Sequence, residues 1–203
     1  AYPHPAPGVP TLPLAGEGHP LTVDEYGDYT VTDPATGRIW DFAGPGGDGD
    51  GIALLSQIID RSGQWLTFEY DDEGAPTGIV HSAGYDLRIE RSGDRITALR
   101  LADPDGDIEL VRFGYDTGGH LSTVTKSSGL PTRFTNDVLG RITAWTDTND
   151  SSYHYVYDDE DRCVSQGGEA GHLSYTYTYG DPDPTTGLRT VTAVNSLGHS
   201  TRY

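Results

Sequence analysis

The chain has 203 residues, with 31 Asp and Glu against 13 Lys and Arg, which gives a formal net charge of −18. A surface this acidic repels phosphate groups, so we expect no nucleic-acid partner and no adsorption to anionic lipid. No apolar run approaches the roughly 18 residues of a membrane span, and residues 1–20 lack the basic region and apolar core of a signal peptide.

Glycine and proline are frequent, but the apolar residues recur in a pattern, which argues against disorder. There are 13 Tyr and only 4 Phe, a balance that suits sheets whose hydroxyl groups reach solvent or a partner. The single cysteine, Cys163, cannot form a disulfide within the chain. No motif surrounds it, so we interpret it as a packed residue and not as a reactive thiol.

Residues 1–50 are predicted to be a Pro/Gly-rich lead-in that carries an irregular first hairpin. Six prolines fall within residues 1–20, which we expect to be extended and to lie on the surface of another element. Two strand-like segments follow, Tyr26–Val31 and Gly37–Phe42, joined by the turn Asp33-Pro34-Ala35-Thr36-Gly37.

Two acidic, glycine-rich loops are candidates for calcium sites. The first, G-P-G-G-D-G-D-G, contains Asp48 and Asp50, and the second is Asp103–Asp107. Calcium needs six or more oxygen ligands and a closing bidentate acid at fixed spacing. A helix-loop calcium hand would place glycine sixth and glutamate twelfth, where the second loop has Ile108 and Gly114. We therefore interpret both loops as hairpin tips and predict no metal site.

From residue 51 onward the chain repeats itself with a period close to 21 residues, as in Gly119 and Gly140 (140 − 119 = 21). The other equivalent pairs include Leu121 and Ile142, Val124 and Trp145, Phe134 and Tyr155, and Asp137 and Asp158. Each unit holds two strand-like runs separated by an Asp-x-x-Gly turn, which predicts a β-hairpin. Residues 51–203 are therefore predicted to be tandem hairpins. Because the last residues stop inside a repeat and the chain lacks an initiator Met, we expect it to be a piece of a longer polypeptide.

Two interleaved series of four-residue turns separate the predicted strands. Where a turn starts with Asp, its side chain accepts a backbone N–H two residues on, and where it ends with Gly, that residue takes the left-handed conformation. The first series comprises Asp60–Gly63, His81–Gly84, Asp103–Gly106, Lys126–Gly129, Asp147–Asp150, Gly168–Gly171 and Asn195–Gly198. The second comprises Asp71–Gly74, Glu90–Gly93, Asp116–Gly119, Asp137–Gly140 and Asp158–Asp161.

Large apolar residues alternate along the runs before the second series of turns. The stripes are Leu66, Phe68 and Tyr70; Val111, Phe113 and Tyr115; Tyr153, Tyr155 and Tyr157; and Tyr175, Tyr177 and Tyr179. Period 2 places each stripe on one face of its strand, and we expect the rings to stack across neighbouring hairpins. An alternative use of the stripes is stacking against sugar rings. Residues 52–59 also fit a helix, but their phase in the repeat favours a strand.

Several phrases resemble the YD repeat of the RHS family. They are Leu66–Gly74, Tyr155-Val156-Tyr157-Asp158, Gly140-Arg141-Ile142 and Gly119-His120-Leu121. The resemblance covers about residues 30–203, and Asp150 and Asp161 depart from it by standing where the repeat has glycine. That family includes bacterial polymorphic toxins, wall-associated proteins, insecticidal toxin-complex subunits and teneurins.

The resemblance implies an all-β fold in which tandem hairpins form a large curved antiparallel sheet, a segment of a YD-repeat shell. In the toxin members the shell encloses a variable C-terminal toxic domain. Some members cleave themselves near the end of the shell at a D-P-x-G-L motif. Residues 181–188 resemble it superficially, but one residue too many separates Pro184 from Gly187, so we expect a long hairpin turn there and no protease carboxylate at Asp183.

Sequence motifs for catalysis are missing. No histidine sits at metal-ligand spacing with another, and there is no phosphate loop, nucleophile elbow or Cys–His arrangement. His120, His172 and His199 each follow a turn glycine, which indicates a repeat position. We nominate no catalytic, cofactor-binding or metal-ligating residue, and we expect no cofactor and no enzymatic activity.

The leading hypothesis is a structural shell segment that encloses or presents a C-terminal cargo domain, a toxin by family resemblance, of the same polypeptide. Its partners would be other YD repeats and that cargo, in an exported or cell-surface bacterial protein. The physical reason is that a hairpin buries its apolar face only by stacking on its neighbours. The alternative is a repeat module that binds extracellular glycan or a cell-surface protein through its tyrosine stripes.

Overall fold

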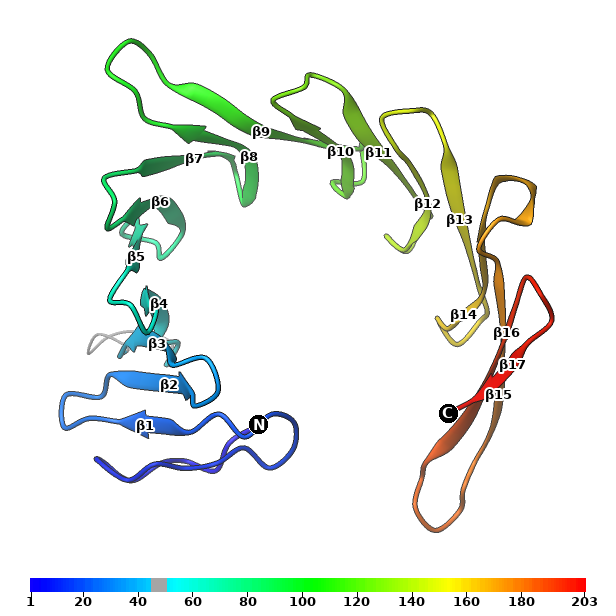
Figure 1. Cartoon of the computed structure of the whole chain (residues 1–203), viewed down its shortest axis with the longest axis horizontal. Coiled ribbons are helices and arrows are strands. Elements are labelled where there is room, and N and C mark those ends of the chain that lie inside the picture. The colour runs from blue at the N-terminus through cyan, green and yellow to red at the C-terminus, as the bar shows by residue number, and fades with distance from the viewer. Residues whose placement is uncertain (45–50) are drawn as a thin grey trace. The chain divides into compact units, whose positions relative to one another are not determined.

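A computed structural model of the protein describes residues 1–44 and 51–203. These residues form 17 antiparallel strands and one short 3₁₀ turn, η1 (Glu169–Gly171), so the predicted all-β hairpin fold is confirmed (Figure 1). The chain divides into two compact units, residues 1–110 and 111–203. The boundary predicted from composition, between residues 50 and 51, does not coincide with this division, and it stays a prediction.

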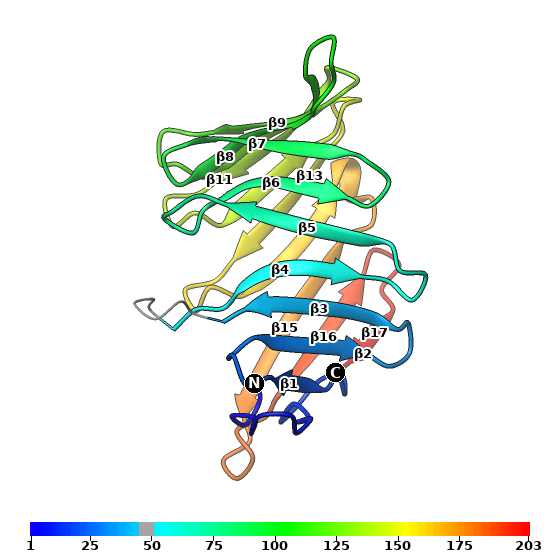
Figure 2. The same ribbon diagram turned by 90° about the vertical axis from the view of Figure 1, so that its left-hand side faces the viewer.

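In the first unit each strand pairs with the next one along the chain, as Figure 2 shows for β2 to β7. Residues 52–59 supply β4, so the strand prediction there is confirmed. The strands are β1 (Leu21–Val23), β2 (Tyr29–Asp33), β3 (Arg38–Ala43), β4 (Leu54–Ile59), β5 (Trp65–Tyr70), β6 (Pro76–His81), β7 (Asp86–Ser92) and β8 (Arg95–Leu101).

The second unit continues the same up-and-down pattern, with β9 beginning just before its first residue. Its strands are β9 (Ile108–Tyr115), β10 (Leu121–Lys126), β11 (Pro131–Asn136), β12 (Ile142–Thr146), β13 (Ser152–Tyr157), β14 (Cys163–Gly168), β15 (Tyr175–Pro182), β16 (Arg189–Asn195) and β17 (Ser200–Arg202).

One turn geometry recurs at seven of the described hairpin tips. At Asp137, the backbone N–H of Gly140 donates to the Asp137 carbonyl (3.0 Å), and the Asp137 N–H donates to the carbonyl of Arg141 (3.0 Å). The Asp137 carboxylate accepts the N–H groups of Leu139 (2.9 Å) and Arg141 (3.0 Å). The same pair of side-chain bonds is made by Asp24, Asp60, Asp71, Asp147, Asp158 and Asn195.

Two predicted turns differ from this geometry. The turn expected at Glu90–Gly93 is wrong, because Ser92 pairs directly with Arg95 and leaves Gly93 and Asp94 as a two-residue tip. Gly93 has φ +58°, and glycine at the first of two tip residues is what a tight type II′ hairpin requires. The turn at 168–171 lies where it was predicted, but it is a longer loop that contains η1 and continues to Ser174.

The lead-in lies alongside β1 (Figure 1). Thr11 and Leu21 exchange backbone hydrogen bonds of 2.8 and 2.9 Å, and the N–H of Gly8 donates to the carbonyl of Val23 (2.8 Å). The expected surface-bound lead-in is thus a cover for the outer edge of the first strand. β2 starts later than the Tyr26–Val31 segment predicted, because Asp24 already forms a repeat turn.

Each unit has one apolar face and one polar face. Residues directly opposite across a strand pair share a face, and one such row runs through Trp40, Ile58 and Leu66. The row behind it runs through Asp41, Gln57 and Thr67. Among the described residues the buried ones are Pro5, Val23, Gly78, Ala98 and Ala193, and none of them has a large side chain. A sheet normally buries one face against a second layer, so the apolar face of each unit is left half-covered.

Candidate functional site: the aromatic face and the repeat turn

The aromatic face of the second unit is centred on β12 and β13. The indole of Trp145 and the ring of Tyr153 are nearly parallel, with centroids 6.0 Å apart and an interplanar angle of 21°. Tyr153 and Tyr155 lie 5.4 Å apart along the same strand, and Trp145 Nε1 donates to the hydroxyl of Tyr155 (3.2 Å). The prediction that the tyrosines share one face is therefore confirmed.

The expected stacking between equivalent tyrosines of neighbouring hairpins is wrong. Tyr155 and Tyr177 lie on β13 and β15, and β14 runs between them. Two strand spacings of roughly 4.8 Å each put equivalent rings too far apart to touch. Gln166 of β14 bridges the space, since it pairs directly with Tyr155 and its Nε2 donates to the Tyr177 hydroxyl (2.5 Å).

The last tyrosine of a stripe anchors its hairpin to the strand before it. The Tyr157 hydroxyl donates to the carbonyl of Ile142 (2.8 Å), 15 residues earlier. Tyr70 and Tyr179 make the same bond, to Leu55 (2.7 Å) and Cys163 (2.8 Å). Asn136 occupies the equivalent position one repeat earlier and donates to Leu121 (2.9 Å), so the repeat retains a donor here even where it loses the ring.

An arginine after the turn glycine position links consecutive hairpins. Arg141 Nε donates to Asp137 (2.7 Å) and NH1 to Asp161 of the next turn (2.6 Å), and its guanidinium lies 4.9 Å from the centre of the Tyr157 ring. Arg162 repeats the arrangement with Asp158 (2.7 Å) and the ring of Tyr179 (4.7 Å). Each arginine therefore holds its own turn and the following tyrosine together.

The titration behaviour of this edge follows from those contacts. The hydrogen bond from the Arg162 side chain, with the backbone N–H of the same residue, holds the pKa of Asp158 below its ordinary value. The hydrogen bond that Arg162 donates to Asp158 in turn raises the pKa of Arg162. Burial raises the pKa of the Tyr157 hydroxyl. Each of these shifts moves a pKa further away from 7. A general acid or base needs a pKa near the working pH, so these groups behave as structural contacts.

Removing the anchoring hydroxyl should weaken the fold measurably. We expect Tyr157→Phe to destabilise the chain by about 1 kcal/mol, because the carbonyl of Ile142 loses its hydroxyl donor while the ring is kept. Urea unfolding followed by tyrosine and tryptophan fluorescence measures the difference. Tyr26→Phe is the matched control, since Tyr26 is 82% exposed. Equal stabilities for the two variants would contradict the anchoring role.

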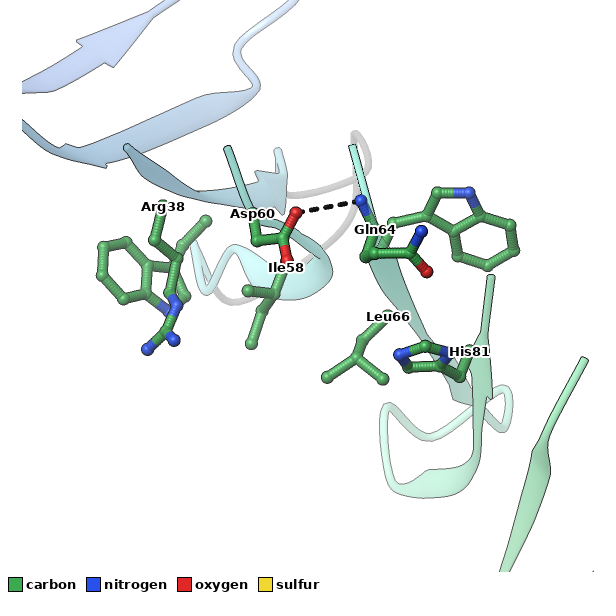
Figure 3. A pocket seen from close by; sticks show the side chains of 8 residues that line it. Arg38, Ile58, Asp60, Gln64, Leu66 and His81 are labelled. Atoms are coloured by element: carbon green, nitrogen blue, oxygen red, sulfur yellow. Dashed lines mark hydrogen bonds between the residues drawn. The ribbon is translucent and has the colours of Figure 1, made fainter. Parts of the chain in front are cut away.

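The apolar face of the first unit carries two adjoining cavities. One of about 330 Å³ is lined by four apolar and four polar side chains: Trp40, Ile58, Trp65 and Leu66, and Arg38, Asp60, Gln64 and His81 (Figure 3). The other, of about 300 Å³, shares Leu66 and His81 and is otherwise lined by Ile79, Tyr85, Leu87, Leu101 and Leu110. The second cavity is lined by apolar side chains apart from His81 and the Tyr85 hydroxyl and suits apolar contacts, whereas the first mixes apolar and polar side chains.

The candidate residues weighed from sequence fall into turns and strands. Asp103 accepts the N–H of Asp105 within a hairpin tip (2.9 Å). Asp183 accepts the N–H groups of Thr185 (2.9 Å) and Thr186 (2.8 Å), in a turn like that at Asp33. Cys163 lies half-buried in β14, where burial raises its thiol pKa. Asp48 and Asp50 lie outside the described residues.

Metal and membrane features are likewise missing from the described part of the chain. No three His, Cys, Asp or Glu side chains within residues 1–44 and 51–203 are grouped so that they could hold a metal ion. No helix in these ranges is long and apolar enough to cross a membrane.

Sequence reasoning missed the bridging role of the post-turn arginines. Gly140-Arg141 served only as a repeat signature. The guanidinium of Arg141 contacts Tyr157, 16 residues further on (157 − 141), and Asp161, 20 residues further on (161 − 141). The recurrence of Arg directly after the turn at 140 and again at 161 was the available signal. His120 holds the same position one repeat earlier, 3.5 Å from Asp116.

A comparison with known protein families finds a repeat in the same part of the chain. Residues 137–173, which include the aromatic strands and both bridging arginines, match the RHS repeat family model. The resemblance seen in the sequence is thereby confirmed, and this all-β chain carries an RHS-type repeat over residues 137–173.

Two curated relatives are bacterial. The chain is 27% identical over 161 residues to the double-stranded DNA deaminase toxin A of Burkholderia cenocepacia (strain H111), a match that covers 77% of the chain and 10% of the relative. It is 25% identical over 126 residues to the probable deoxyribonuclease RhsA of Dickeya dadantii (strain 3937), covering 62% and 9%. The chain thus spans about a tenth of the length of these relatives.

Solved structures share the fold. Crystal structures of TcdB2-TccC3-Cdc42 and of TcdB2-TccC3 without its hypervariable C-terminal region superpose on 96% of the chain, with TM-scores of 0.50 and 0.51 and 10% identity. The chain corresponds to 16% and 15% of those chains. At this identity the likeness concerns the fold alone.

Proposed function

We propose that the chain is a structural segment of an RHS-repeat shell that encloses or presents a C-terminal domain, a toxin, of the same polypeptide. The observation that carries this proposal is the half-covered apolar face in each unit, with only Pro5, Val23, Gly78, Ala98 and Ala193 buried in the described chain. A face of this kind becomes stable when further polypeptide lies against it.

The comparisons support the same proposal. The bacterial relatives are named for nucleic-acid-modifying activities, yet the chain aligns with only about a tenth of each. The aligned tenth is repeat sequence, so we assign the repeats no catalytic part and leave any activity to another region of the polypeptide. A toxin of a bacterium acts outside the cell that makes it, which favours export as the location of the assembled protein.

Limited proteolysis of the longer polypeptide tests the enclosure. We expect a segment C-terminal to the repeats to resist protease until the repeats are unfolded by denaturant, with mass spectrometry identifying the protected residues. The isolated C-terminal segment, digested under the same conditions, is the control and should be cut quickly. Immediate cleavage of everything beyond the repeats would overturn enclosure and favour binding of extracellular glycan or a cell-surface partner through the aromatic face.

A further inference from the structure

The loop that joins β14 to β15 builds a second kind of site, on the aromatic face of the second unit. A cavity of about 400 Å³ lies between this loop and the paired rings of Trp145 and Tyr153. Glu169, His172 and Leu173 line it from the loop side, and Ser151 and Ser152 complete it from the neighbouring strand. The cavity therefore has an aromatic floor and a rim that includes a carboxylate.

The loop is held over the rings in a costly conformation. Ala170 (φ +53°) and Leu173 (φ +51°) both lie in the left-handed region although neither is glycine, and such positions persist only where surrounding contacts impose them. The Tyr153 hydroxyl donates to the carbonyl of Leu173 (3.0 Å), and Gly168 donates to the carbonyl of His172 (2.8 Å). These bonds fix the rim relative to the floor.

The chemistry of the cavity favours a cation. Aromatic faces attract guanidinium and ammonium groups, and the attraction grows when the cation is partly desolvated. Elsewhere the chain already places an arginine over its aromatic rings, at Trp40, Tyr157 and Tyr179. Within the described residues, no arginine or lysine lies over Trp145 or Tyr153, and the carboxylate of Glu169 has no ionic partner.

We infer that this cavity binds an arginine side chain supplied by another polypeptide segment, with the guanidinium over the Trp145 and Tyr153 rings and paired to Glu169. The hydroxyl of Ser152 is hydrogen-bonded to that of Thr146 (2.9 Å) on the other face of β13, so the rings and Glu169 supply the recognition. The net charge of −18 favours the approach of such a basic segment. The site does not depend on enclosure of a cargo, so it stands apart from the proposed function.

Titration of the 203-residue chain with N-acetyl-arginine amide tests the site. In a ¹H–¹⁵N spectrum of the labelled chain, the indole N–H of Trp145, identified with Trp145→Phe, should shift saturably. N-acetyl-citrulline amide, which is isosteric and neutral, should leave it unmoved. Glu169→Gln should weaken the arginine affinity by about fivefold or more, because a charge-assisted contact is lost.

Asp159→Asn is the matched control for the charge change, since Asp159 is an exposed acid in the turn at the other end of β14. It should leave the affinity for N-acetyl-arginine amide unchanged. Equal binding of the citrulline compound, equal losses in Glu169→Gln and Asp159→Asn, or a saturable shift with maltose in place of arginine would each overturn the inference. Both substitutions lie in exposed loops, so the fold is retained in either variant.

Discussion

Deleting residues 1–18 is expected to raise the share of dimers and larger assemblies over that of the intact chain. The deletion removes the backbone partners of Leu21 and Val23, which Thr11 and Gly8 supply at 2.8 to 2.9 Å. β1 then presents an open row of N–H and C=O groups, and such an edge pairs readily with a strand of another molecule. Light scattering coupled to size-exclusion chromatography measures the change.

The composition of the lead-in explains why it ends the sheet and does not extend it. Proline has no N–H to donate, so a proline-rich segment cannot itself serve as an edge for a further strand. Five prolines fall within the deleted stretch, at positions 3, 5, 7, 10 and 13. Thr11→Pro should reproduce part of the effect by removing the Thr11 donor, whereas Leu12→Pro should not. Unchanged monomer content after the deletion would refute the capping role.

Acid should unfold the chain through its turns. The pKa of Asp147 is lowered by the backbone N–H groups of Ser151 and Asn149, and that of Asp158 by the Arg162 side chain. Hydrogen bonds of the same kind lower the pKa values of Asp33, Asp71, Asp116 and Asp183. Together with the turn at Asp137, seven turns thus depend on carboxylates whose folded pKa lies below the ordinary value of 3.8.

The sign of the effect follows from linkage. A group with a lowered folded pKa binds its proton more readily when unfolded, so its stabilisation is complete above pH 3.8 and is lost as the pH falls through the folded pKa. We expect the urea midpoint to fall steeply between about pH 4 and about pH 2, measured by fluorescence at constant ionic strength. A flat midpoint over that interval would show that the turn carboxylates carry no such stabilisation.

Asp147→Asn provides the matched control for that titration. Asn195 already closes a turn of the same geometry, accepting the N–H groups of Leu197 (3.0 Å) and His199 (2.9 Å). The amide oxygen should therefore keep the turn at 147 while removing its titration. The acid limb of the variant should be shallower than that of the parent chain, and its stability at neutral pH should be nearly unchanged.

Much of this fold was accessible from the residues alone, and the reason is that its rules are local. The Asp-x-x-Gly turns depend on bonds between residues two to four apart, as at Asp137 and Arg141. Period 2 in Tyr153, Tyr155 and Tyr157 places the rings on one face without reference to any other part of the chain. Even the strand at 52–59 followed from its phase in the repeat.

The tertiary structure decided what depends on contacts between repeats. Whether Tyr155 meets Tyr177 or Gln166 is a matter of strand order, which puts β14 between them. The arginine at 141 acquires its partners only because the next hairpin folds back to place Tyr157 and Asp161 beside it. The left-handed residues Ala170 and Leu173 follow no local preference, since only the Tyr153 hydroxyl and the loop's own backbone bonds hold them there.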